Sequence, residues 1–88
     1  MSDKRTAARE ALDAHDALRA TDASEPKGVD ESSPPAAREA WLAWHSDERQ
    51  PAYARWEAAM DALDAALGYE VGRHPFTFRP ICEDILNG

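Results

Sequence analysis

The sequence predicts an all-α protein, and three observations support this prediction. Alanine, which favours helix, makes up 18 of the 88 residues. Apolar residues recur at helical spacing between residues 51 and 67. Serine and proline stand where two helices are expected to begin, at Ser33-Pro34 and at Pro51. Alternation typical of a strand is confined to residues 69–79.

Residues 1–20 are expected to form an N-terminal helix or arm. Ala7, Ala11, Ala14 and Leu18 fall at helical spacing and would share one face. Because most of this face is alanine, docking it would bury little apolar area. We expect this helix to be loosely packed, or to form on contact with a partner.

Residues 21–33 are predicted to be a flexible linker, which would leave residues 34–88 as a separate helical domain. The linker is rich in proline, serine and charge, and its only large apolar residue is Val29. Such a composition cannot bury enough surface to offset the entropy lost on ordering.

Two helices are predicted within the domain, at residues 34–46 and 51–67. Residue Gln50 precedes Pro51 and is expected to leave helical geometry, which would place a short turn between the helices. A turn of this length predicts an antiparallel helix hairpin. Gly68 is expected to end the second helix in the left-handed conformation.

The helix at residues 51–67 has the strongest pattern in the chain. Five apolar residues recur at intervals of three and four and form a seam: Tyr53, Trp56, Met60, Leu63 and Leu67. Alanines line one edge of this seam and acidic residues line the other. We expect the alanine edge to pack closely against the helix at 34–46 and the acidic edge to remain in water.

Residues 69–79 are predicted to be an extended loop or a very short hairpin, since Tyr69 and Val71 alternate with polar residues, as do Phe76 and Phe78. Pro80 is expected to open a short C-terminal helix.

The composition excludes several classes of protein. With ten basic and seventeen acidic residues and a net charge of −7, the chain lacks the clustered cations that bind nucleic acid directly. No apolar run approaches the roughly 18 residues of a membrane span, and the N-terminus lacks the apolar stretch of a signal peptide. We therefore expect a cytoplasmic protein that contacts neither nucleic acid nor membrane.

No residue pattern predicts catalysis, a metal or a cofactor. His15, His45, His74 and Cys82 lack the close spacing of metal ligands. Contiguous residues such as those at 45–47 cannot face one another as a catalytic triad requires. We expect the protein not to be an enzyme.

Partner-binding residues are instead predicted along the acidic edge and at the end of the first domain helix. Trp41 and Trp56 are expected in the core, whereas Trp44 is expected to be exposed. Tryptophan is enriched at the centres of interfaces. The predicted contacts with another protein are Trp44, Glu57, Asp61 and Asp64.

Two short segments, Glu39-Ala40-Trp41-Leu42 and residues 52–57 (AYARWE), resemble the helix-turn-helix segment in the cytoplasmic N-terminal domain of FecR-type sigma-factor regulators. The resemblance covers about a quarter of the chain and implies that the protein binds a sigma factor.

The leading functional hypothesis is a small acidic interaction module, a regulator or inhibitor that acts by protein–protein contact. One alternative is a phage-type DNA mimic that blocks a nucleic-acid-binding enzyme through its acidic surface. Others are a sigma-factor-binding domain and a structural homodimer joined through the seam of residues 51–67.

Overall fold

The protein is all-α, as the sequence predicts. A computed structural model describes residues 3–72 and 77–88, and these residues form helices, turns and loops without a strand. The elements, in chain order, are α1 (Asp3–Ala23), α2 (Pro35–Trp44), a π-helical turn η1 (His45–Arg49), α3 (Gln50–Leu67) and α4 (Phe78–Asn87).

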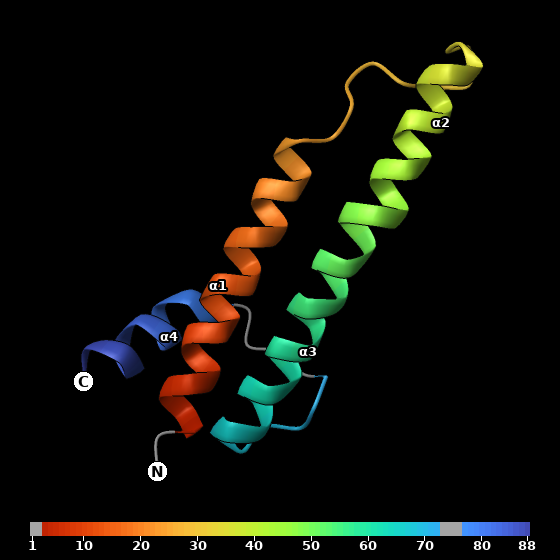
Figure 1. The fold of residues 1–88 in the computed structure, drawn as a ribbon. Helices are drawn as coiled ribbons and strands as arrows, with labels where there is room; N and C mark the ends of the chain where they lie inside the picture. Colours follow the sequence, from red (N-terminus) through yellow and green to blue (C-terminus); the bar gives the residue numbers. More distant parts are fainter. Residues whose placement is uncertain (1–2, 73–76) are drawn as a thin grey trace.

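The predicted hairpin between residues 34–46 and 51–67 is wrong, because α2, η1 and α3 form one continuous helix (Figure 1). Gln50 keeps helical dihedral angles (φ −62°, ψ −46°), and its N–H bonds to the carbonyl of His45, five residues earlier. The chain therefore does not turn at Pro51.

The π turn explains how the helix continues through this proline. Within an α-helix, the ring of Pro51 would press on the carbonyl of Asp47, and proline has no N–H to donate. A π turn is wider than an α turn and commonly appears as a single insertion within an α-helix. The five-residue turn just before Pro51 thus absorbs the irregularity that would otherwise end the helix.

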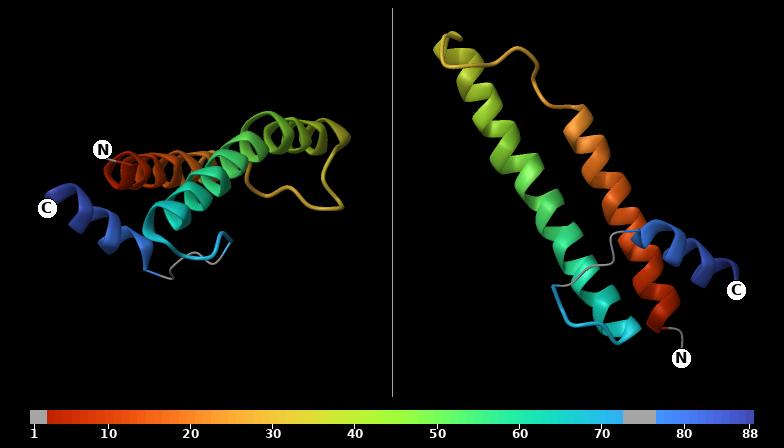
Figure 2. Two further views of the ribbon diagram at one scale, coloured as in Figure 1. Left: turned by 90° about the horizontal axis from the view of Figure 1, so that it is seen from below. Right: turned by 180° about the vertical axis from the view of Figure 1, so that it is seen from behind.

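Helix α1 runs antiparallel to this long helix and packs against α3 (Figure 1, Figure 2). It ends three residues later than predicted, because proline and glycine appear only from Pro26 onward. The alanine face of α1 is buried, and its members are Ala7, Ala8, Ala11 and Ala14. Small side chains let the two helix backbones approach closely, so the seam of α3 is covered by α1 and not by α2.

The core lies where three helices meet. Its buried members are Ala7, Ala8 and Ala11 from α1, Met60 and Leu63 from α3, and Cys82 from α4. Larger side chains that remain partly accessible surround them, among them Trp56, Phe78 and Ile85. Trp56 is half-buried and packs against this core, whereas Trp41 is half-buried but lies outside it, so the prediction of a core position is wrong for Trp41.

Arginine side chains connect α1 to the other helices. Arg55 makes two hydrogen bonds to Glu10, at 2.8 and 2.9 Å. Arg49 pairs with Asp22 at 2.8 Å, and Arg79 pairs with Asp16 at 3.0 Å. Arg5 donates to the carbonyls of Ile85 and Leu86, which lie in the last turn of α4. The N-terminal helix is therefore held along its whole length.

Gly68 ends α3 as predicted, with φ of +79°. The N–H of Tyr69 bonds to the carbonyl of Asp64 at 2.8 Å, and that of Gly68 to the carbonyl of Ala65. These two bonds form a Schellman motif, which satisfies the last carbonyls of the helix. The described residues of the next segment form a turn and no strand, while His74 and Phe76 lie outside the described residues.

Helix α2 extends beyond the end of α1. Residues 35–67 form a rod of about 50 Å, whereas the 21 residues of α1 span only about 30 Å. The N-terminal end of α1 and the C-terminal end of α3 both lie near α4, so the shorter α1 stops before it reaches the start of α2. Helix α2 therefore projects past α1, and among the described residues the loop 24–34 lies beside it (Figure 1). This is the least covered part of the fold.

Candidate interaction surface

Two of the four predicted contact residues are buried and not exposed. Trp44 is only 7% exposed, and its indole N–H donates to the hydroxyl of Ser24 at 3.1 Å. Asp64 is fully buried, and its carboxylate accepts the backbone N–H of Gly72 at 3.2 Å. The expected exposure of both is wrong because each is contacted by a segment outside its own helix: the loop after α1 reaches Trp44, and the turn after α3 reaches Asp64.

The other two predicted contacts differ from each other. Glu57 is exposed on α3, as expected. Asp61 is half-buried and takes part in an interaction within the chain. The acidic edge of α3 is therefore not a continuous surface facing water, since its C-terminal part serves the chain's own packing.

The structure brings no metal-binding cluster together in the described ranges 3–72 and 77–88. His45 lies in η1, where its ring stacks on Trp41 with centroids 5.1 Å apart. The sequence predicts that His45 lies near the end of a helix. This prediction is wrong, because the helix continues through η1 into α3. Cys82 is fully buried, and burial raises the pKa of its thiol. A buried thiol with a raised pKa is a poor nucleophile and a poor ligand.

His15 occupies the junction of α1 and α4. Its ring meets Phe78 edge-on at 5.1 Å, and its Nδ1 lies 2.8 Å from a guanidinium nitrogen of Arg79. Burial lowers the pKa of His15, and the charges of Arg79 and Arg19 lower it further. The neutral ring accepts a hydrogen bond from Arg79, so this histidine links two helices.

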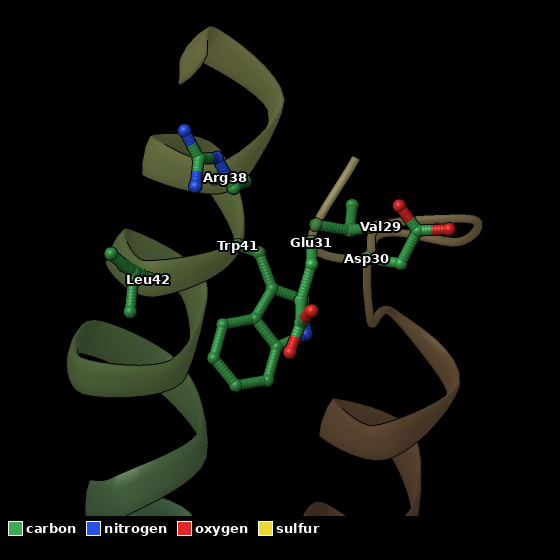
Figure 3. A pocket seen from close by; sticks show the side chains of 6 residues that line it. All are labelled: Val29, Asp30, Glu31, Arg38, Trp41 and Leu42. Carbon is green, nitrogen blue, oxygen red and sulfur yellow. The ribbon is translucent and has the colours of Figure 1, made fainter. Parts of the chain in front are cut away.

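The projecting α2 forms a hollow with the loop that leads into it. Val29, Asp30 and Glu31 contribute from the loop, and Arg38, Trp41 and Leu42 from α2 (Figure 3). The hollow has a volume of about 370 Å³. A smaller one of about 230 Å³ adjoins it, lined by Pro35, Arg38, Glu39 and Leu42. Leu42 belongs to both hollows and is 58% exposed.

Hydrogen bonds hold the loop in place over Trp41 and Trp44. The indole N–H of Trp41 donates to Glu25 at 3.2 Å, as that of Trp44 does to Ser24. Further along, the carboxylate of Asp30 accepts the N–H of Ser32 at 2.8 Å and its hydroxyl at 2.6 Å. These bonds, with a smaller contribution from Ser33, lower the pKa of Asp30 and form an Asx turn.

The charge of the hollow is mixed but mainly acidic. Figure 3 shows Glu31 beside the indole of Trp41, whereas the carboxylate of Asp30 points away toward its own turn. Glu39 lines the smaller hollow, and Arg38 is the one cation lining either of them. Within the described part of the chain, the side chains of Glu31, Glu39 and Arg38 make no hydrogen bond or ion pair, and all three residues are exposed, so their charges face solvent.

Comparison with protein-family models, characterised proteins and solved structures gives no match. The segment that resembles FecR-type regulators lies within the continuous helix at residues 35–67 and contains no helix-turn-helix. The described residues include no helix that is both long enough and apolar enough to cross a membrane.

The hollow was not predicted from the sequence, because three of its lining residues, Val29, Asp30 and Glu31, lie in the segment predicted to be a flexible linker. Three signals were present. Asp30 with serines two and three residues later is typical of an Asx turn, and Val29 is an isolated apolar residue beside that turn. Leu42, off the tryptophan face of its helix, was the third sign of an apolar surface.

Proposed function

We propose that the protein is a small interaction module that regulates or inhibits another protein by direct contact through the surface of α2 and the loop 24–34. The observation that supports it is the exposed Leu42, which stands beside the half-buried Trp41 on a helix that projects beyond the rest of the fold. An exposed large apolar side chain that adjoins a tryptophan and lines two hollows forms a local apolar surface, and tryptophan is enriched where proteins bind one another.

Several features make this end of the molecule suitable for contact. The loop is fixed by its own hydrogen bonds, so little ordering entropy would be lost on binding. The hollow is also at the lower limit of pockets that hold small-molecule ligands or cofactors. A partner side chain suits this space better than a cofactor does.

Affinity capture with three forms of the full chain tests the proposal. The forms are the wild type, Leu42→Asp and Ala58→Asp, the last a matched control at an exposed position of α3. We expect at least one protein, from a lysate of the organism that encodes the chain, to bind the wild type and the control but not Leu42→Asp. Reconstitution with the purified partner should then show a change in its activity.

Circular dichroism must show equal helix content for the three forms. If all three retain the same proteins, the α2 surface is not the site of contact. Glu57→Lys in the same experiment tests whether the contact extends along α3, because Glu57 is the exposed member of the predicted set.

A further inference from the structure

The two hollows around Leu42 can be assigned a partner of particular chemistry. Their apolar surface comes from Val29, Trp41 and Leu42, with Pro35 at the far side. Leu42 and Arg38 line both hollows, so a partner segment that covers Leu42 can reach both. The larger hollow is big enough for one or two side chains.

The charged residues around the two hollows determine which kind of partner segment would bind there. Glu31 beside Trp41 and Glu39 beside Leu42 face solvent without an internal partner among the described residues. Arg38 alone opposes them along the two hollows. A partner with lysine or arginine at these two points would gain attraction and a faster association rate, and it would meet a chain whose net charge is −7.

The loop that carries Glu31 is preorganised. Its Asx turn fixes residues 30–33, and the indole of Trp41 binds Glu25 at the loop's other end. Glu31 is therefore presented from a fixed backbone, although its own side chain is exposed. A fixed carboxylate selects the position of a partner's cation more sharply than a mobile one does.

We propose that the α2 surface binds a basic peptide segment of another protein, with one large aliphatic or aromatic side chain seated against Trp41 and Leu42. Lysine or arginine residues on either side of this anchor lie beside Glu31 and Glu39. The inference rests on the proposed function and adds the chemistry of the partner. A second copy of the chain fits less well, because it would bring the same carboxylates and a second charge of −7 to the surface.

Selection from a displayed library of random dodecapeptides tests this inference. The wild-type chain is the bait, and binders that also hold Leu42→Asp are removed. We expect the remaining sequences to share one large apolar residue with lysine or arginine within a few positions of it. A synthetic peptide of the enriched sequence is then titrated by fluorescence anisotropy.

Variants of the chain give the quantitative result. Leu42→Asp should weaken the peptide about tenfold or more, and the pair Glu31→Lys with Glu39→Lys about tenfold. The pair Glu83→Lys with Asp84→Lys makes the same charge change at exposed positions of α4, at the opposite end of the molecule, and should leave affinity unchanged. The effect of the double variant should shrink as salt rises, whereas that of Leu42→Asp should persist.

The other outcomes overturn the inference in distinguishable ways. Leu42-dependent peptides that are neutral or acidic would refute the basic partner while leaving the proposed function in place. A wild-type dimer in sedimentation that Leu42→Asp dissociates would identify a second copy as the occupant. If no Leu42-dependent peptide is selected and capture also finds no Leu42-dependent protein, both proposals fail.

Discussion

The two ends of the long helix differ in what covers them. At the α3 end, α1 packs against the long helix and α4 packs against α1, and Met60, Leu63 and Cys82 in the shared core are completely buried. At the α2 end a single loop lies alongside, and Leu42 remains exposed. The two ends of the long helix therefore differ in role: the packed α3 end contributes most of the stability, and the projecting α2 end leaves apolar surface accessible. Substitutions at the two ends should therefore have different consequences.

The largest difference in the free energy of unfolding is expected between alanine substitutions of two leucines in the same long helix. Leu63→Ala removes a fully buried side chain from the three-helix core and should lower the free energy of unfolding by about 2–5 kcal/mol. That is a large fraction of the stability of a chain of this size. Leu42→Ala should change it by no more than about 0.5 kcal/mol. Urea unfolding followed by circular dichroism at 222 nm measures both.

If Leu63→Ala does not fold, Met60→Leu offers a milder change at the same core, with an expected cost below about 1.5 kcal/mol. Equal losses for Leu63→Ala and Leu42→Ala would contradict this difference in role, because they would mean that the projecting end is as tightly packed as the core.

A smaller but clear difference is expected between two acidic residues of α3. Asp64→Ala removes a fully buried side chain together with the acceptor of the Gly72 N–H, which should cost about 1–3 kcal/mol. Asp64→Asn keeps an acceptor oxygen and should cost less. Glu57→Ala, at an exposed position, should fall within about 0.5 kcal/mol of the wild type. Thermal unfolding of the three variants ranks them, and a neutral Asp64→Ala would show that this carboxylate is not structural.

Local sequence patterns predicted most of the packed end and little of the projecting one. Burial of Met60, Leu63 and Ala11 follows from helical spacing, and the end of α3 follows from Gly68. The prediction of a helix start at Pro51 is wrong. It assumed that proline begins a new helix, whereas the π turn before Pro51 allows the existing helix to continue.

Burial of Trp44 and Asp64 could not be read from spacing. Each depends on a loop residue, Ser24 or Gly72, that reaches it only after the chain has folded. The hollow at α2 was missed for the same reason. Its loop is polar in composition but ordered by hydrogen bonds between particular side chains and the backbone.

The packed end should also respond to pH through His15. Its folded-state pKa is lowered from 6.5, chiefly by burial and then by Arg79 and Arg19, so the unfolded chain binds a proton more readily. Stability should be fully present above about pH 6.5 and should fall as pH drops through the lowered pKa. Urea midpoints between pH 7.5 and 5.5 measure this slope.

His15→Gln is the matched control, because glutamine can accept the hydrogen bond of Arg79 without titrating. The variant should lose the slope over this pH range. Glu10, whose pKa is lowered by its hydrogen bond from Arg55, loses its contribution only below about pH 4.5 and does not interfere. An unchanged slope in His15→Gln would assign the titration to another group.

The smallest effect is expected where the two ends meet. There Asp22, near the end of α1, pairs with Arg49 in the π turn, with side chains 48% and 29% exposed. Arg49 also lies over the ring of Tyr53 at 4.9 Å, so removing it alone disturbs two contacts. A double-mutant cycle with Asp22→Asn and Arg49→Gln separates them. The coupling should be about 0.2–1 kcal/mol and should decrease as salt is added.

The size of this coupling decides what sets the boundary between the two ends. A small coupling energy means that packing of the alanine face of α1 determines where the packed end stops. The ion pair between Asp22 and Arg49 then adds little to it. A coupling well above this range would mean that charge holds α1 against the π turn. Losing the pair would then lengthen the projecting end, and Leu42→Asp and Arg49→Gln would no longer act independently on partner binding.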